Sequence, residues 1–335
     1  MKTRSSTAAP RPSRPRGFTM VELLVAMVLS MLMALAAVAS VVIARQGFTT
    51  VDAASQLRDN SRFVADLIQR VVVQTGYQDV VYATATRENE FNTVATSALP
   101  EPFIFGFNNK LVAANPLAAS STPGLSGSDV LVLRYQSSET VTGSGVADKT
   151  MIDCAGVSAA APKSRNERIV SAFHVSIVNS DPTLICSSGV ADSAGNVTWS
   201  TTGPQPIVSG IETFQVLYGT DGVSPGGAPV ATTDSVPDRF LRADELTVPG
   251  NTVATYANWA RVRSVRIGIV LRAAANSANE PDTLIRYPLG QVLSSANDAF
   301  SIYPAHNDQR LRQVAAFTVY LRNTQSQTGL TGSSP

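Results

Sequence analysis

The sequence predicts an α+β protein in which a long N-terminal α-helix packs on an antiparallel β-sheet head with long loops. Three observations lead to this fold class. No proline occurs between residues 16 and 99, an apolar run near the N-terminus passes into an amphipathic pattern, and the remaining chain alternates apolar and polar residues between Gly- and Pro-rich stretches. The chain has 335 residues, which is long enough for a sizeable core.

A basic leader comes first and is predicted to occupy residues 1–17. It carries five basic residues and no acid, so its removal from a chain of formal charge +1 leaves −4. This asymmetry favours a cytoplasmic leader by the positive-inside rule. The same charge is not a nucleic-acid signature, because it would be removed with the leader.

An apolar run follows the leader, from Val21 to Ile43. Its 23 residues include only three polar side chains, Glu22, Ser30 and Ser40. As a helix it would be roughly 35 Å long, enough to cross a hydrocarbon core of ~30 Å. A single carboxylate at the start of such a segment is costly in lipid and therefore predicts a functional role.

Two simpler interpretations of this region compete. A secretory signal peptide could be cut after Ala37-Val38-Ala39, which would release a soluble protein and leave Glu22 without a purpose. A plain signal anchor would place Glu22 at the headgroups. The combination of Gly17, an aromatic Phe18 and Glu22 directly before the apolar run argues against both.

This combination resembles the class III signal of type IV pilins and pseudopilins. The resemblance implies that a prepilin peptidase cuts after Gly17 and that Phe18 becomes the N-methylated N-terminus. It also implies that Glu22 pairs with the α-amine of a neighbouring subunit inside the filament. A buried ionic pair of this kind specifies the stagger of the helices more than it adds affinity. Residues 18–44 are the expected transmembrane and filament-core helix.

The helix is expected to continue as an amphipathic segment over residues 45–76. Its predicted apolar stripe comprises Val51, Ala54, Leu57, Val64, Leu67, Ile68 and Val71. Gly76 is the expected C-terminal stop, and Gly47 is the only obvious weak point. An uninterrupted helix from Phe18 to Thr75 would be about 87 Å long.

The β-rich head is predicted over residues 77–323, with a disordered tail at 324–335. Alternation predicts half-buried strands near residues 129–135, 169–178, 211–218, 263–272 and 317–321. Residues 83–126, 137–166, 187–205 and 221–256 are expected to be loops.

Chemistry-bearing motifs are absent from the head sequence. Cys154 and Cys186 form an even pair in an exported domain, which favours a disulfide over a metal site or a catalytic thiol. His174 and His306 are expected to be structural or solvated, and no catalytic or phosphate-loop motif occurs. Four arginines between residues 261 and 272 divide between two strand faces, which disfavours nucleic-acid binding. We therefore expect no catalysis, no cofactor and no metal.

The head also resembles that of PilW-like minor pilins, through the stretch Val208–Gly219, the strand after Trp259 and the closing Tyr320-Leu321-Arg322-Asn323. The resemblance implies a minor pilin in the bacterial inner membrane, with a periplasmic head and later a place in the pilus. Its implied partners are other minor pilins, the major pilin, the prepilin peptidase/methyltransferase and the inner-membrane assembly platform. A type II secretion pseudopilin, or a tip adhesin or DNA-uptake subunit, remains the alternative.

Overall fold

The fold was examined in a computed structural model. It describes residues 17–79, 102–111, 120–141, 143–163, 167–192, 196–231, 234–295 and 298–323. The predicted leader, apart from Gly17, and the predicted tail lie outside these residues. The chain divides into two compact units, Met1–Thr49 and Thr50–Pro335, and each is described by itself.

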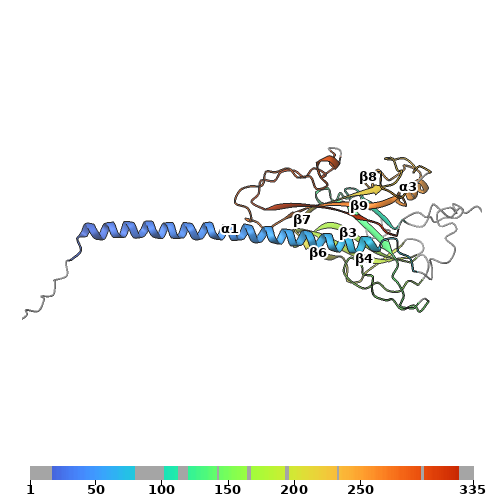
Figure 1. Cartoon of the computed structure of the whole chain (residues 1–335), viewed down its shortest axis with the longest axis horizontal. Helices are drawn as coiled ribbons and strands as arrows, with labels where there is room; N and C mark the ends of the chain where they lie inside the picture. Colours follow the sequence, from blue (N-terminus) through green and yellow to red (C-terminus); the bar gives the residue numbers. More distant parts are fainter. Residues whose placement is uncertain are drawn as a thin grey trace, which may run out of the picture. The chain divides into compact units, whose positions relative to one another are not determined.

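One helix, α1 (Met20–Gln74), contributes to both units (Figure 1). Gly47 lies inside it without interrupting it, although the division between the units falls only two residues later. Gly76, at φ +77°, follows its C-terminal end, where a left-handed residue suits glycine. By length and composition, α1 contains a segment apolar enough to cross a membrane.

The second half of α1 carries a buried stripe at the three- and four-residue spacing of an amphipathic helix. The stripe consists of Ala53, Leu57, Ser61, Val64, Ile68, Val71 and Val72. The expected stripe is confirmed from Leu57 onward, but its first turn is wrong. Val51 is exposed and Ala53 is buried in its place.

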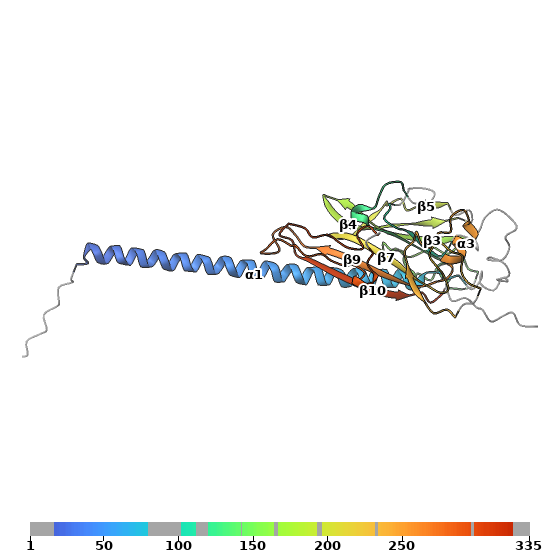
Figure 2. The same ribbon diagram turned by 90° about the horizontal axis from the view of Figure 1, so that it is seen from above.

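Two antiparallel sheets form the head (Figure 1, Figure 2). The six-stranded sheet contains β1 (Ile104–Phe107), β2 (Val130–Tyr135), β3 (Arg168–Val178), β4 (Asp181–Ala191), β5 (Val197–Trp199) and β6 (Gln205–Ser209). The four-stranded sheet has the order β10 (Arg312–Tyr320), β9 (Val262–Arg272), β7 (Ile211–Thr220) and β8 (Arg239–Leu241). Side chains from both sheets and the buried stripe of α1 belong to one apolar core.

The chain passes from the first sheet to the second at Gly210, between β6 and β7. Its N–H donates to the carbonyl of Pro182 at 2.7 Å, and its own carbonyl accepts from the N–H of Arg272 at 2.7 Å. Gly210 has φ +84°, and a Cβ there would lie 2.5 Å from the Arg272 carbonyl oxygen. Only glycine fits this crossing without strain.

The five predicted strands are present, but the expectation that they are half-buried is wrong for β2, which is buried at every position, and for the two central strands of the second sheet. β7 is buried at every position, and β9 at nearly every one. The second face of β9 lies under residues 273–311, the connection to β10. Arg266 donates to the carbonyl of Leu289, and the missing side chain of Gly268 leaves room for the carbonyl of Pro288.

Several segments expected to be loops contain regular structure. β1, β5 and β8 are short strands within them, and β4 extends to Ala191. A helix, α3 (Thr252–Trp259), also lies there, with the Asn251 side chain accepting from the N–H of Ala254 at its N-terminus. These elements were missed because short strands and a two-turn helix carry little periodic signal.

Candidate assembly helix and the ionic cluster of the head

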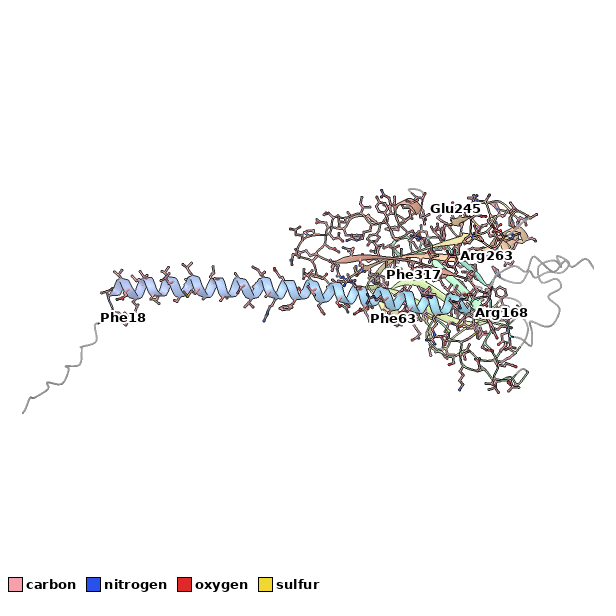
Figure 3. All side chains as sticks on the ribbon, viewed as in Figure 1. Phe18, Phe63, Arg168, Glu245, Arg263 and Phe317 are labelled. Atoms are coloured by element: carbon pink, nitrogen blue, oxygen red, sulfur yellow. A yellow bond between two sulfur atoms is a disulfide. The ribbon has the colours of Figure 1, made fainter. Side chains whose placement is uncertain are left out.

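The predicted processing and assembly residues lie within six positions of one another in the sequence: Gly17 and Phe18 directly precede α1, and Glu22 is in its first turn. Figure 3 shows Phe18 at the start of the helix. Thr19 caps the helix, since its Oγ1 accepts from the N–H of Glu22 at 3.3 Å and its carbonyl accepts from Leu23. Thr19-Met20-Val21-Glu22 is the sequence pattern of a capping box. Sequence reasoning missed this cap, although the spacing was visible.

Among the described residues, nothing requires glycine at position 17. A Cβ at this position would meet no heavy atom within 4 Å, and its backbone is not in the left-handed region. A requirement for a small residue would therefore come from another molecule. Recognition by a peptidase would supply such a requirement.

Cleavage after Gly17 would create a positive α-amine directly before the helix N-terminus. The N-terminus of a helix carries a partial positive charge, so an ammonium there is unfavourable unless a carboxylate is near. Glu22 is the only acid in the first turn, and it is solvent-exposed in the isolated chain. The site therefore presents one cation and one anion that can pair within or between subunits.

Every residue from Met20 to Thr49 is exposed in the structure. The exposed large apolar side chains include Leu24 at 58%, Leu29 at 52% and Leu35 at 66%. Such a long apolar surface cannot face water in a stable protein. This half of α1 therefore requires a partner outside the chain, either lipid or other helices.

The predicted disulfide between Cys154 and Cys186 is present, with a Cα–Cα distance of 5.6 Å. The segment directly before Cys154 is tied to the end of α1. The Gln74 amide donates to the carbonyl of Ile152 at 3.1 Å and accepts from its N–H at 3.0 Å. Closing a loop of 32 residues contributes about 3–4 kcal/mol on the chain-entropy model.

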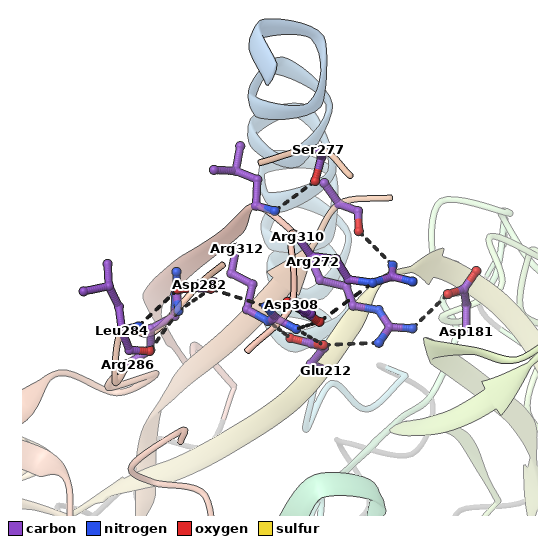
Figure 4. Close-up of polar contacts among 12 residues, drawn as sticks. Asp181, Glu212, Arg272, Ser277, Asp282, Leu284, Arg286, Asp308, Arg310 and Arg312 are labelled. Atoms are coloured by element: carbon purple, nitrogen blue, oxygen red, sulfur yellow. Dashed lines mark hydrogen bonds and ion pairs between the residues drawn. The ribbon is translucent and has the colours of Figure 1, made fainter. Parts of the chain in front are cut away.

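A buried ionic cluster stands on the outer face of the second sheet (Figure 4). Glu212 on β7 accepts from Arg312 on β10 at 2.6 and 3.1 Å, and from Arg272 on β9 at 3.3 Å. Arg312 also pairs with Asp282 at 3.3 Å and with Asp308. The side chain of Arg312 is only 1% exposed. The cluster thus fastens residues 273–311 to three strands.

The pKa shifts in the cluster agree with these pairs. Burial by itself would lower the pKa of Arg312, but its bonds to Asp308 and Glu212 outweigh burial and raise it. The bond from Arg312 lowers the pKa of Asp308. Burial opposes the shift at Asp282, yet the bonds from Arg286 and Arg312 still lower its pKa. All three groups are therefore charged at neutral pH.

The sequence analysis included Glu212 only within the PilW-like stretch Val208–Gly219 and predicted no ion pair for it. Its signal was an acid in an otherwise uncharged strand, β7, with Arg272 at the end of the neighbouring strand β9 and Arg312 at the start of the next strand, β10. The arginines of residues 261–272 are occupied inside the fold. Arg263 pairs with Asp221 at 3.6 Å, and Arg272 pairs with Asp181 at 2.9 Å.

The histidines are not brought together. Burial lowers the pKa of His174 on β3 to about 4, so it is neutral at physiological pH. His306 stacks against Tyr303 with ring centroids 4.9 Å apart. Within the described part of the chain, no group of three His, Cys, Asp or Glu side chains has the geometry to hold a metal ion.

Comparisons with known proteins give matches for both the N-terminal segment and the head. Residues 172–323 match the family model for Type IV Pilus-assembly protein W, PilW, and residues 12–38 match the prokaryotic N-terminal methylation motif. A solved structure, the Type IV-like pilin TTHA1219 from Thermus thermophilus, is 14% identical and covers 81% of this chain and 100% of its own, with a TM-score of 0.39. That likeness is too distant to carry an argument. No curated protein matches the chain.

A match to the N-terminal methylation motif, followed by one long helix and a β-rich head, gives the chain the organisation of a type IV pilin. Within that class the head resembles PilW over residues 172–323. Both predicted resemblances are confirmed. Type IV pilins are structural subunits, and the apolar helix with its signal indicates membrane anchoring.

Proposed function

We propose that this chain is a minor pilin, a non-catalytic subunit that joins other minor pilins to prime assembly of a type IV pilus at its tip. Before assembly it is held in the bacterial inner membrane by α1, with its head in the periplasm. The prepilin peptidase/methyltransferase removes residues 1–17 and methylates Phe18. The assembly platform and the major pilin are its further partners.

The observation that carries this proposal is the isolated charge at the start of α1. Glu22 is the only charged side chain between Phe18 and Ile43, in a segment whose residues are all exposed. An unpaired charge in lipid costs roughly 2.5–3.5 kcal/mol on insertion scales. Pairing with the α-amine of an adjacent subunit removes that cost at one register only, which selects an ordered assembly.

Substitution of the acid tests the proposal. Glu22→Ala is expected to leave cleavage and membrane insertion intact and to reduce co-purification with partner pilins by at least about tenfold, since 1.4 kcal/mol corresponds to a factor of ten. Ser30→Ala is the matched control, because Ser30 lies in the same segment and bonds only to the carbonyl of Met27. Co-purification at the level of the Ser30→Ala control would contradict the assembly role of Glu22.

N-terminal sequencing tests the processing step. The natural product should begin at Phe18 in cells with the prepilin peptidase and retain the leader in cells without it. A product that begins at Ser40 would identify a secretory signal peptide and overturn the proposal.

A further inference from the structure

The end of the head at which α1 enters has an unusual surface. Thr50 is the first residue of the second unit, and its hydroxyl donates to the carbonyl of Ser277 at 3.1 Å. Ser277 belongs to the 273–311 connection. Arg272, the last residue of β9 directly before this connection, pairs with Asp181 at the start of β4 at 2.9 Å. We call this end, defined by residues 177–182, 210–212, 272–286 and 308–312, the entry end of the head.

All exposed Leu and Ile side chains of the described head lie at the entry end. They are Ile177 at 51%, Leu284 at 66% and Ile285 at 55%. Elsewhere in the described head, the exposed large apolar side chains are valines and single aromatics, including Val236 at 56%. The longest aliphatic side chains left in contact with solvent are thus concentrated at one place.

A chain of ion pairs holds this surface in position. The Arg286 guanidinium donates to the carbonyl of Leu284 at 3.0 Å and pairs with Asp282 at 2.8 Å. Asp282 in turn pairs with Arg312, which is bound to Glu212 in the central strand β7. These bonds hold the backbone at Leu284, the residue next to Ile285, in a fixed position (Figure 4). Fixed groups lose less conformational entropy when they bind.

The short distance along α1 between the apolar run and Thr50 limits how far the entry end can lie from a membrane. Ile43, the last residue of the apolar run, and Thr50 are seven residues apart in one helix, or about 10 Å along its axis. Once the apolar run is in a bilayer, the entry end is therefore tethered close to the lipid headgroups. We propose that Ile177, Leu284 and Ile285 contact the membrane interface while the subunit is stored there.

The contact is apolar in character. The entry end also carries the exposed carboxylates Asp181 and Glu280, which repel anionic lipids, so we attribute the contact to apolar burial. Burial of aliphatic side chains at the boundary of headgroups and acyl chains is the physical basis. The contact should consequently be insensitive to salt, whereas an electrostatic contact would weaken as the salt concentration rises. This inference rests on the proposed membrane anchoring.

The experiment uses the full chain, one copy per nanodisc of phosphatidylethanolamine and phosphatidylglycerol. A fluorophore is attached to Ile285→Cys under oxidising conditions, which keep the native disulfide closed. Val236→Cys is the matched control because its exposure, 56%, equals that of Ile285, 55%, at a site outside the entry end. Quenching by headgroup spin-labelled lipid should be at least about twofold stronger at residue 285 and unchanged by high salt.

A second variant tests the ion-pair chain. Asp282→Asn should weaken the quenching at residue 285 and leave that of a label at Ile177→Cys unchanged, since Ile177 is on a different element. Equal quenching at residues 285 and 236 would overturn the inference. So would quenching at residue 285 that appears only with several copies per disc, which would assign the surface to a neighbouring protein. Failure of the chain to enter discs would overturn the membrane anchoring as well.

Discussion

The two halves of α1 share one backbone geometry and differ in everything that surrounds it. From Met20 to Thr49 every residue is exposed, whereas from Ala53 to Val72 one stripe is buried in the core of the head. The first half is apolar on all sides and the second on one side only. A helix that is apolar all round needs a non-aqueous environment, and an amphipathic one needs a single packed face.

This difference indicates which interactions stabilise each half of α1. The second half packs against strands of the same chain, so its contribution to folding can be measured on the head alone. The residues of the first half, from Met20 to Thr49, are all exposed in the described chain, so the main contribution of this half is expected on insertion or assembly. Substitutions should therefore separate into two groups with different measurable effects.

The largest loss of unfolding free energy is expected from a substitution in the ionic cluster of the head. Glu212→Gln would leave Arg312 and Arg272 buried without their shared carboxylate, and breaking such a buried pair costs about 3–5 kcal/mol. Denaturant unfolding of the detergent-solubilised chain measures this loss of unfolding free energy. Asp244→Asn is the control, because Asp244 is 54% exposed and pairs with Arg242 at the surface, where such pairs contribute at most about 1 kcal/mol. Equal losses would mean that the cluster does not anchor residues 273–311.

An intermediate effect is expected from matched truncations in the two halves of α1. Ile68→Ala removes a side chain that is 0% exposed and should cost roughly 2–5 kcal/mol of unfolding free energy. Leu29→Ala, at 52% exposure, should leave the head's unfolding unchanged. The same denaturant titration compares them. A similar loss in both variants would contradict the separation of the two halves.

The smallest effect is a pH dependence of the head. Burial lowers the pKa of His174 to about 4, below the value of about 6.5 expected in the unfolded chain. Stability is therefore fully present above about pH 6.5 and decreases as the pH falls toward 4, on the order of 1–3 kcal/mol. His174→Gln should flatten this part of the stability profile. A histidine variant with the wild-type pH profile would show that another group is responsible.

Much of the fold was predictable because its signals are local. The absence of proline and the change from an all-apolar to an amphipathic pattern predicted α1, and alternation predicted β2, β3, β7, β9 and β10. The class III signal depends on adjacent residues, so it too is contained in the sequence. The pairing of Cys154 with Cys186 followed from their being the only two cysteines.

Other features depend on what lies across from a residue rather than beside it in the chain. Alternation could not reveal that residues 273–311 cover β9, because the covering segment has no period of its own. The chain passes from the first sheet to the second at one residue, Gly210. The ion pair between Glu212 and Arg312 joins residues 100 positions apart in the sequence. The sequence by itself therefore determined the long helix, the five longer-patterned strands β2, β3, β7, β9 and β10, and the signal, which arise from short-range patterns. Only the tertiary structure decided the second sheet, the covered strands and the ionic cluster, because burial and charge pairing are set by long-range packing.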